Sequence, residues 1–248
     1  MKVTIERAAL LKALAHAQSV VERRNTIPIL ANVRLSAEGS SLSLTATDMD
    51  LSIVEQTEVA VTSPGSTTAP AHMLYDIARK LPEGAQVELD ATTKEGQLTL
   101  RAGRSTFSLA SLPVDEFPVL AQSESGHTFT VAARDLRSLI DRARFAISTE
   151  ETRYYLNGIY LHPTENEGVA VLRAVATDGH RLARVEIPLP DGAAGMPGVI
   201  VPRKTVAEVR KLLDDASDDV QVTVSETKIR FTLGPVELTS KLIDGTFP

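Results

Sequence analysis

The chain has 248 residues, a formal net charge of −6 and no cysteine. At about 100–200 residues per domain, this length favours two domains, and 43% hydrophobic with 23% charged residues excludes wholesale disorder. The lack of cysteine excludes disulfides and thiolate chemistry. No apolar run is long enough to span a bilayer, and charged residues interrupt the N-terminal segment. We therefore expect a cytoplasmic protein with no membrane partner.

An internal repeat organises the sequence. Residues 3–22 match residues 129–148, because each segment opens with a short alternating strand and continues into a helix with apolar residues three and four apart. Further matches follow in the same order: LTATD (44–48) with AVATD (174–178), Pro70 with Pro202, and Phe117-Pro118 with Phe247-Pro248. Proline is favoured at a first helical position, so Pro70 and Pro202 are each expected to open a second helix.

The elements of each repeat can be predicted in chain order. Helices, counted with their lead-ins, are expected within 7–24 and 72–80 in the first copy, and within 134–144 and 203–211 in the second. Strands are expected within 33–61, 85–103 and 105–112, and then within 156–163, 168–178, 181–189, 219–234 and 236–242. The pattern predicts an α+β fold of two tandem repeats, each with two helices packed on antiparallel sheets. The expected domains are 1–121 and 127–248, joined by a polar linker at 122–126.

Charge is divided between the predicted helices and the rest of the chain. The four helical segments hold 14 basic and five acidic residues, whereas the remainder holds 12 basic and 27 acidic residues. Solvated helix faces often carry Arg and Lys, but a bias on all four helices indicates one basic surface built from helices and an acidic exterior built from sheets. Such a surface would attract phosphate without reading bases.

Five motifs resemble those of one known family, the bacterial sliding clamp (the beta subunit of DNA polymerase III). They are NTIPIL (25–30), RYYLNG (153–158), ATDGHRLA (176–183), VIVPRK (199–204) and SKLIDGTFP (240–248). The resemblance implies the DNA clamp fold, in which helices line a ring around duplex DNA. Clamps of this family have three such repeats per subunit, and two subunits join head to tail. The third clamp domain is absent from this sequence, so we expect the two-domain chain not to close a ring by itself.

The resemblance also implies a set of DNA contacts. Arg24, Tyr154 and Tyr155 match family positions that meet DNA, although Arg24 alone would be read as a solvated helix end and the tyrosines as core residues. Further expected pore-facing cations are Arg79, Arg203, Lys204, Arg137 and Arg144, the last two on charge bias only. Two family contacts are replaced here by His72 and Glu150, and Glu150 should repel phosphate.

A second implied site is a peptide-binding cleft. The matching residues are Leu156, Thr177, Gly179, His180, Arg181, Leu182 and Pro248. A simpler interpretation of this polar stretch is a tight turn held by Asp178, with Gly179 at positive φ. Without a third domain, peptide affinity is expected to be weak or lost.

The predicted function is a non-enzymatic processivity factor with no catalytic residue, metal or cofactor. Its expected partners are double-stranded DNA, DNA polymerase III subunits, the clamp loader and other proteins carrying a clamp-binding motif. Two alternatives stay open: a small hydrolase using Asp178 and His180 as an acid–base pair, and a peptide-binding adaptor with no role on DNA.

Overall fold

The computed structural model describes residues 1–120, 126–216 and 218–248. The chain divides into two compact units, unit 1 (Met1–Leu120) and unit 2 (Ala121–Pro248). Of the predicted linker at 122–126, only Gly126 lies among the described residues.

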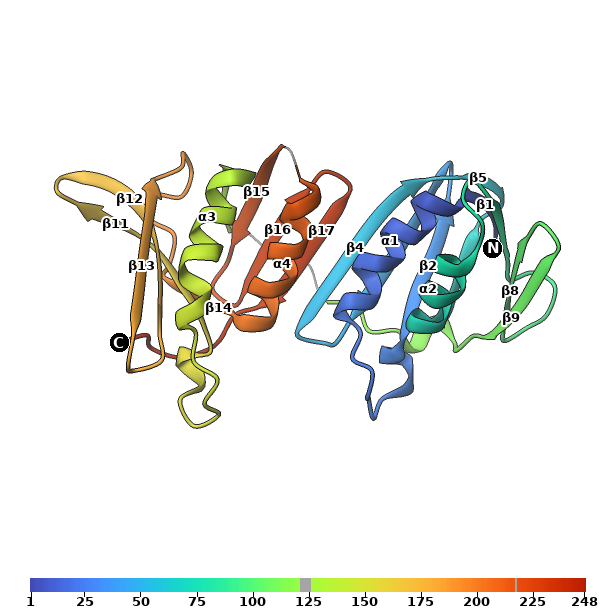
Figure 1. The fold of residues 1–248 in the computed structure, drawn as a ribbon, viewed down its shortest axis with the longest axis horizontal. Helices are drawn as coiled ribbons and strands as arrows, with labels where there is room; N and C mark the ends of the chain where they lie inside the picture. The colour runs from blue at the N-terminus through green and yellow to red at the C-terminus, as the bar shows by residue number, and fades with distance from the viewer. Residues whose placement is uncertain (121–125, 217) are drawn as a thin grey trace. The chain divides into compact units, whose positions relative to one another are not determined.

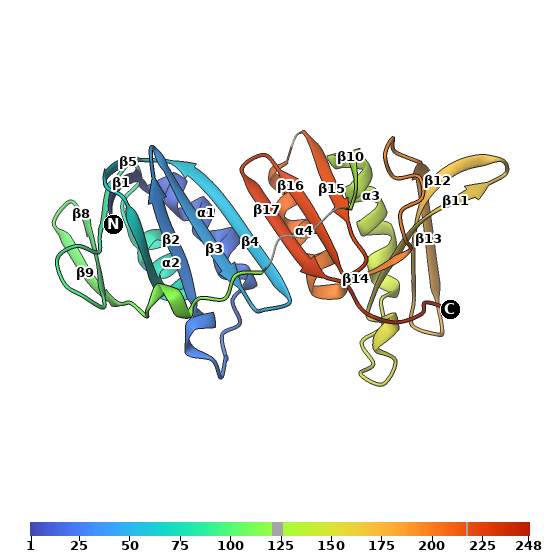
Figure 2. The same cartoon turned by 180° about the vertical axis from the view of Figure 1, so that it is seen from behind.

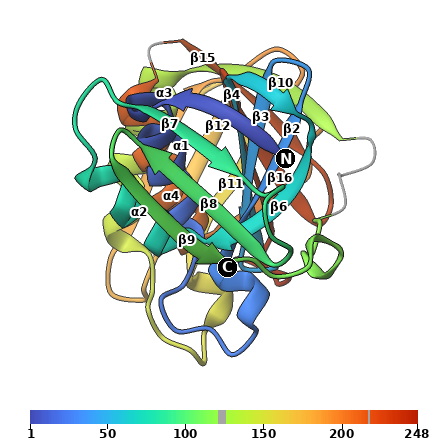
Figure 3. The same cartoon turned by 90° about the vertical axis from the view of Figure 1, so that its right-hand side faces the viewer.

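Unit 1 places two helices on antiparallel sheets. In chain order its elements are β1 (Lys2–Glu6), α1 (Arg7–Val20), η1 (Pro28–Ala31), β2 (Asn32–Glu38), β3 (Ser41–Thr47), β4 (Leu51–Glu58), β5 (Ala60–Ser63), β6 (Gly65–Pro70), α2 (Ala71–Lys80), β7 (Gln86–Asp90), β8 (Gln97–Ala102), β9 (Ser105–Ala110) and η2 (Val114–Glu116). Neighbouring strands follow the orders β5-β1-β7-β8-β9 and β4-β3-β2-β6. Figure 1 shows α1 and α2 side by side in front of β2 and β4, and Figure 3 shows β7, β8 and β9 running together.

Unit 2 repeats this arrangement. Its elements are β10 (His127–Ala132), α3 (Ala133–Ala143), η3 (Arg144–Ala146), η4 (Tyr154–Leu156), β11 (Gly158–Asn166), β12 (Val169–Thr177), β13 (Leu182–Pro188), β14 (Val199–Pro202), α4 (Arg203–Asp215), β15 (Asp219–Val224), β16 (Lys228–Leu233) and β17 (Val236–Lys241). Its strands follow the orders β10-β15-β16-β17 and β13-β12-β11-β14. In Figure 2, β15, β16 and β17 lie on the near side of α4.

The two units share one connectivity. Both units run through the same order of elements. In unit 1 this order is β1-α1-η1-β2-β3-β4-β6-α2-β7-β8-β9, and in unit 2 it is β10-α3-η4-β11-β12-β13-β14-α4-β15-β16-β17. Strand β5 is an addition in unit 1. Corresponding strands also have corresponding neighbours in the two sheets of each unit. The predicted α+β fold, with two helices packed on antiparallel sheets in each repeat, is therefore confirmed.

Apolar spacing determines which helix face is buried. In α1, Leu10, Ala13, Leu14 and Ala17 are buried, and in α3 Leu136, Leu139, Ile140 and Ala143 are buried. These positions recur every three or four residues, so they form one stripe that packs on the sheets. The first helix is shorter than predicted, because Val21 is already extended and Arg23 and Arg24 follow in a loop.

Both prolines lie one residue before the position predicted for them. Pro70 and Pro202 are the last residues of β6 and β14 and form the N-caps of α2 and α4. Their strand pairing, with Asn32 and Gly158 respectively, keeps them extended. The fixed φ of proline is compatible with both the strand end and the helix start.

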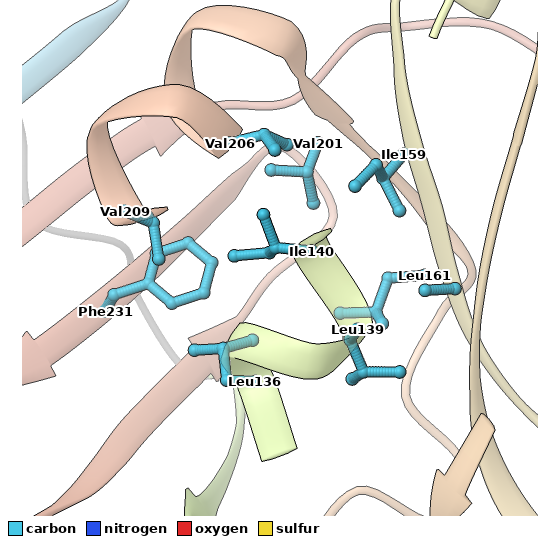
Figure 4. A pocket seen from close by; sticks show the side chains of 10 residues that line it. Leu136, Leu139, Ile140, Ile159, Leu161, Val201, Val206, Val209 and Phe231 are labelled. Atoms are coloured by element: carbon cyan, nitrogen blue, oxygen red, sulfur yellow. The ribbon is translucent and has the colours of Figure 1, made fainter. Parts of the chain in front are cut away.

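The core of unit 2 contains a small apolar cavity of about 30 Å³. Figure 4 shows it between α3, α4 and the sheets, with Ile140 near its middle and Val209 beside Phe231. A void of this size holds no more than about one water, and an apolar lining offers that water no hydrogen-bond partner. It is therefore a packing defect rather than a ligand site.

Within the part of the chain that the structure describes, no helix is long and apolar enough to cross a membrane.

Candidate nucleic-acid and peptide interface

A hydrogen-bonded turn joins β12 to β13 in unit 2. Oδ1 of Asp178 accepts hydrogen bonds from the backbone N–H groups of His180 and Arg181, each at 3.0 Å. The Thr177 hydroxyl donates to the Arg181 carbonyl at 2.8 Å. The two backbone N–H bonds are the main reason that the pKa of Asp178 falls to about 2. The tight turn predicted around Asp178 is confirmed, as is positive φ at Gly179 (89°).

This geometry does not support a hydrolytic pair. His180 approaches Asp178 through its backbone N–H, and the second carboxylate oxygen of Asp178 accepts from Nε of Arg181 at 2.9 Å. The carboxylate is thus occupied by the turn and by Arg181 instead of orienting an imidazole. Among the described residues, no cluster of histidine and acidic side chains could hold a metal ion.

Arg153 connects this turn to the loop that precedes η4. Its Nη2 donates to the Asp178 carbonyl at 3.2 Å. A Cβ at Gly179 would lie 2.6 Å from Nη1 of Arg153, so the missing side chain makes room for the guanidinium. Gly179 thus meets two requirements at once, a positive φ and a close approach by Arg153.

The loop itself is closed by short-range bonds around Glu150. Nε and Nη2 of Arg153 donate to the two Glu150 carboxylate oxygens at 2.8 and 2.6 Å. The Glu150 backbone N–H donates to the Ser148 hydroxyl at 3.1 Å, and its carbonyl accepts from Nδ2 of Asn157 at 3.1 Å. These hydrogen bonds from Arg153 lower the pKa of Glu150 and raise the pKa of Arg153, so both groups stay charged.

The predicted tyrosine pair lies on η4, directly after Arg153. Tyr154 is 54% exposed, and its ring meets that of Tyr155 edge-on with centroids 5.9 Å apart. The C-terminal segment packs beneath the pair, since a Cβ at Gly245 would lie 3.1 Å from Cβ of Tyr155. Phe247 then stacks on Tyr160 at 5.0 Å. Tyr154 is therefore a solvent-facing aromatic ring packed edge-on against Tyr155, and not a core residue.

Exposed apolar side chains flank the turn. Leu182 is 63% exposed at the start of β13, and Phe145 on η3 is 54% exposed with the Arg181 guanidinium 5.6 Å above its ring. Of the other predicted cleft residues, Leu156 is buried and Pro248 is exposed. The structure thus brings together Thr177, Gly179, His180, Arg181 and Leu182 in one turn and places Leu156 at the end of η4.

Sequence reasoning missed two members of this region. Arg153 stands in the quoted RYYLNG motif but was not assigned a role, and Phe145 follows a predicted helix without any motif. Arg153 carried a usable signal, because it stands three residues after Glu150, and arginine forms two-pronged hydrogen bonds with carboxylates. Phe145 carried no such signal, since its partner Arg181 is remote in the chain.

The predicted cations of unit 1 lie near the ends of its helices. Arg24 is exposed in the loop after α1. Arg79, in the last turn of α2, pairs with Asp76 at 3.2 Å and lies over the Tyr75 ring at 5.7 Å. His72 is half-buried, and its Nε2 donates to the Val21 carbonyl at 3.0 Å, so it joins the end of α1 to the start of α2.

Arg203 and Lys204 begin α4 in unit 2. The first turn of this helix contains no acidic residue. Two cations therefore lie at the helix end where the backbone dipole is already positive, which concentrates positive potential at one point.

Two of the cations expected from charge bias contact their own unit. Arg137 donates through Nη2 to the Leu213 carbonyl in the last turn of α4, where a helix leaves its carbonyls without intrahelical partners. Arg144 is exposed and pairs with Asp141 at 3.4 Å. Asp141 also accepts from Nε of Arg210 at 2.7 Å. Part of the positive charge on α3 and α4 thus joins these helices to each other, and DNA contact by Arg137 and Arg144 stays a prediction.

Comparisons with known proteins cover the whole chain. Residues 1–121 match the sequence profile of the DNA polymerase III beta subunit N-terminal domain, and residues 130–248 match that of its central domain. The chain belongs to the DNA polymerase III beta subunit family, the beta sliding clamps. The beta sliding clamp of Caulobacter vibrioides is 57% identical over 248 residues, and that of Pseudomonas aeruginosa is 42% identical over 249 residues.

Solved sliding clamps have the same fold. The Caulobacter crescentus pol III beta structure matches with a TM-score of 0.97 at 57% identity, and the clamp of Bartonella birtlesii bound to griselimycin matches with 0.96 at 49% identity. Each match covers 100% of this chain and about two thirds of the other, 67% and 66% respectively. Another C. crescentus beta sliding clamp structure contains bound polyethylene glycol.

Proposed function

We propose that this chain acts on duplex DNA as part of a sliding clamp, a processivity factor that holds a replicative polymerase on its template. The observation that carries the proposal is the match to beta sliding clamps across both units, at 57% identity and a TM-score of 0.97. A clamp retains DNA by enclosing it, so its contacts must be numerous, weak and indifferent to sequence. The ring would form from head-to-tail subunits, and the setting would be the bacterial cytoplasm.

The proposed DNA contacts are four exposed residues, Arg24, Arg79, Arg203 and Tyr154, and two half-buried ones, Lys204 and Tyr155. Arg24, Arg79, Arg203 and Lys204 would meet phosphates, and Tyr154 and Tyr155 would meet the DNA backbone or bases. The N-terminal end of α4 supports this assignment, because Arg203 and Lys204 add their charge to the helix dipole there. Arg137 and Arg144 are weaker candidates, since both already contact groups of their own unit.

The second proposed surface binds short peptides of the DNA polymerase III subunits, the clamp loader and other clamp-binding proteins. Leu182 and the residues of the Thr177–Arg181 turn would form one wall of the cleft, with Leu156 and Pro248 beside them. An exposed leucine next to a preformed turn suits an apolar peptide anchor with a few polar contacts.

The experiment measures binding of this chain to a short duplex by fluorescence anisotropy across a series of salt concentrations. We expect weak binding that is independent of sequence and falls steeply with salt, with a log–log slope of about −0.9 per phosphate neutralised. Arg24→Glu and Arg203→Glu should each weaken binding and make the slope shallower by about one unit, since each removes a phosphate contact.

The matched control is Lys94→Glu, an equal charge reversal at an exposed residue between β7 and β8. It should change affinity much less than the helix-end variants do. A peptide-binding adaptor with no role on DNA predicts instead that no variant alters DNA association. Binding that discriminates between sequences would contradict the clamp proposal.

A further inference from the structure

We propose that Arg210 is a further DNA-binding cation of unit 2, and that Asp141 and Asp214 limit DNA affinity by keeping its guanidinium bound to the protein. This role rests on the proposed function, because it concerns how strongly the helices of unit 2 contact a duplex. It is suggested by the ionic contacts between α3 and α4.

Arg210 lies on the side of α4 that also carries a proposed phosphate contact. Four residues of this helix are spaced by four, three and four positions, which places them on one side: Arg203, Ala207, Arg210 and Asp214. All of them except Arg210 are exposed, and Arg210 is half-buried. Seven residues of α-helix rise by about 10 Å, so a released Arg210 would extend the cationic surface of Arg203 along the helix.

Carboxylates occupy the guanidinium of Arg210 from two helices. Its Nε donates to Oδ1 of Asp141 on the neighbouring helix α3 at 2.7 Å (Figure 1), and its Nη1 donates to Oδ1 of Asp214 at 2.5 Å. These hydrogen bonds raise the pKa of Arg210 and lower the pKa of Asp214, so both groups stay charged. The Arg210 side chain is only 19% exposed. Its charge is therefore used within the unit.

Positive charge exceeds negative charge around these two carboxylates. Nε of Arg144 lies 3.4 Å from Asp141, and Arg137 and Arg144 both help to lower the pKa of Asp214. Three arginines thus share two aspartates, which leaves one positive charge in excess. An excess cation attracts a phosphate to this cluster, and the phosphate can then compete with the carboxylates for Arg210.

The carboxylates can be replaced without separating the two helices. Asp214 is 64% exposed, and an ion pair with an exposed partner contributes little to stability. Arg137 still joins α3 to α4 through the Leu213 carbonyl, and both helices keep their buried apolar residues. Release of Arg210 therefore requires only side-chain movement.

Duplex DNA suits a released Arg210 better than a peptide does. A guanidinium binds phosphate with the same donors that it uses for a carboxylate. Arg203 and Arg210 present two such groups on one side of α4, which matches a polyanion with regularly spaced charges. A single acidic side chain of a peptide would satisfy only one of them.

The test measures the log–log salt slope of binding to a short duplex, in a background of Arg144→Gln because Arg144 also pairs with Asp141. Adding Asp141→Asn/Asp214→Asn releases Arg210 and should steepen the slope by about 0.9, the value for one added phosphate contact. Adding Arg210→Gln to that variant should remove the gain. Asp141→Ala/Asp214→Ala should give the same steeper slope, so the test does not depend on the folding of one variant.

The matched control is Asp135→Asn/Asp191→Asn in the same background. It also removes two negative charges from unit 2, but Asp135 pairs with Arg134 and Asp191 lies in an exposed turn. Its slope should equal that of the background. The proposal is overturned if both pairs of substitutions give equal slopes, or if the gain persists with Arg210→Gln. Stronger binding of an acidic peptide without a steeper DNA slope would also overturn it.

A second measurement distinguishes failure of this role from failure of the clamp proposal. Inorganic phosphate is titrated into each variant while the Arg210 Nε–H signal is followed by nuclear magnetic resonance. The signal should shift in Asp141→Asn/Asp214→Asn at phosphate concentrations that leave the control variant unchanged. If the signal shifts but no variant binds DNA, the clamp proposal fails and the restrained cation stands. If the signal does not shift, Arg210 only joins α3 to α4 and the proposal is wrong.

Discussion

The two units contain the same turn with different surroundings. In unit 1, Oδ1 of Asp48 accepts from the N–H groups of Asp50 and Leu51 at 3.0 and 2.7 Å, and the Thr47 hydroxyl donates to the Leu51 carbonyl at 2.9 Å. The turn of unit 2 is built from the same bonds around Asp178. At the positive-φ position, however, unit 1 has Met49 (78°) where unit 2 has Gly179 (89°).

This difference shows that backbone conformation and steric access are two separate reasons for the residue type at the positive-φ position. Met49 shows that the turn itself accepts a side chain at positive φ, at a cost of about 1 kcal/mol in strain. Gly179 has a second effect, because a Cβ there would lie 2.6 Å from Nη1 of Arg153 and the end of that side chain would have to shift. In unit 2 the shared turn thus also contacts the Arg153 guanidinium, through the Asp178 carbonyl.

The segments that follow β9 in unit 1 and β17 in unit 2 also differ between the two units. Phe117 of unit 1 is buried in an apolar cluster with Ile29 and Leu30 of η1 and Leu112. Its counterpart Phe247 stacks on Tyr160 instead. Unit 1 therefore covers the apolar residues of η1 with its own chain, whereas the corresponding region of unit 2 keeps Leu182 and Tyr154 exposed.

The largest expected effect comes from Phe117→Ala compared with Phe247→Ala. Removing a buried phenylalanine typically costs about 3–5 kcal/mol of unfolding free energy, whereas loss of one partly exposed stacking contact costs about 1 kcal/mol. Hydrogen exchange in β2 and β3 for unit 1, and in β11 and β12 for unit 2, reports the two losses separately. Equal losses in both units would show that Phe117 does not close an apolar cluster.

Acid should destabilise unit 1 through Asp90. Thr92 donates to this carboxylate from its hydroxyl and its backbone N–H, which lowers the pKa of Asp90 to about 2. Because the folded pKa is below the unfolded value of about 3.9, the stabilisation is complete above that value and is lost as pH falls towards 2. The side chain is 4% exposed, so the loss should approach about 2 kcal/mol.

Urea denaturation between pH 5 and pH 2, followed by hydrogen exchange in β7, measures this loss. The control is Asp90→Asn, which should be less stable at pH 5 and show a flatter dependence on pH. An unaltered chain with no loss of unit 1 stability over this range would contradict the prediction.

The two turns can be compared directly by placing alanine at the positive-φ position of each. Gly179→Ala should lower stability by about 1–2 kcal/mol, because it adds backbone strain and displaces Arg153. Met49→Ala should change stability by less than about 0.5 kcal/mol, since Met49 is exposed and already adopts this conformation. Thermal denaturation, together with amide hydrogen exchange at Arg181 and Leu51, measures the loss of stability in each variant. A loss in Gly179→Ala no larger than the about 1 kcal/mol of backbone strain that Met49 already carries would mean that Arg153 contributes nothing to the preference for glycine.

The smallest expected effect concerns core packing. Val209→Ile adds one methylene beside the cavity of unit 2 and should raise stability by about 0.5–1 kcal/mol. Val87→Ile adds the same group at a fully buried position of unit 1 that does not line this cavity, and should lower stability by about 1 kcal/mol through overpacking. Chemical denaturation measures whether the unfolding free energy rises in Val209→Ile and falls in Val87→Ile.

Much of the fold could be predicted from the sequence because its determinants are local. The apolar positions of α1 and α3 recur at helical spacing, and the Asp178 turn depends on bonds between residues two and three apart. These patterns were readable without coordinates. The boundary at Val20 was not, because Val21 continues the apolar pattern although its backbone is already extended.

The parts of the site that escaped prediction depend on contacts remote in sequence. Arg137 and Leu213 are 76 residues apart, so charge bias alone could not show that this guanidinium binds the end of α4. The link from Arg153 to Asp178 spans 25 residues and depends on the path of two loops. Charge counts predict that a helix is basic, but they do not show which of its cations are already paired or hydrogen-bonded with groups of their own unit.

The position of β1 has a consequence for how the protein is made. This strand lies between β5 and β7, pairing Lys2 with Ser63 and with Asp90. Residues near 90 must therefore leave the ribosome before the first residues can complete their sheet, and at roughly 5–20 residues per second this takes several seconds. During synthesis the N-terminal strand has unpaired edges, so it is a segment that chaperones or early pairing with β5 would need to protect.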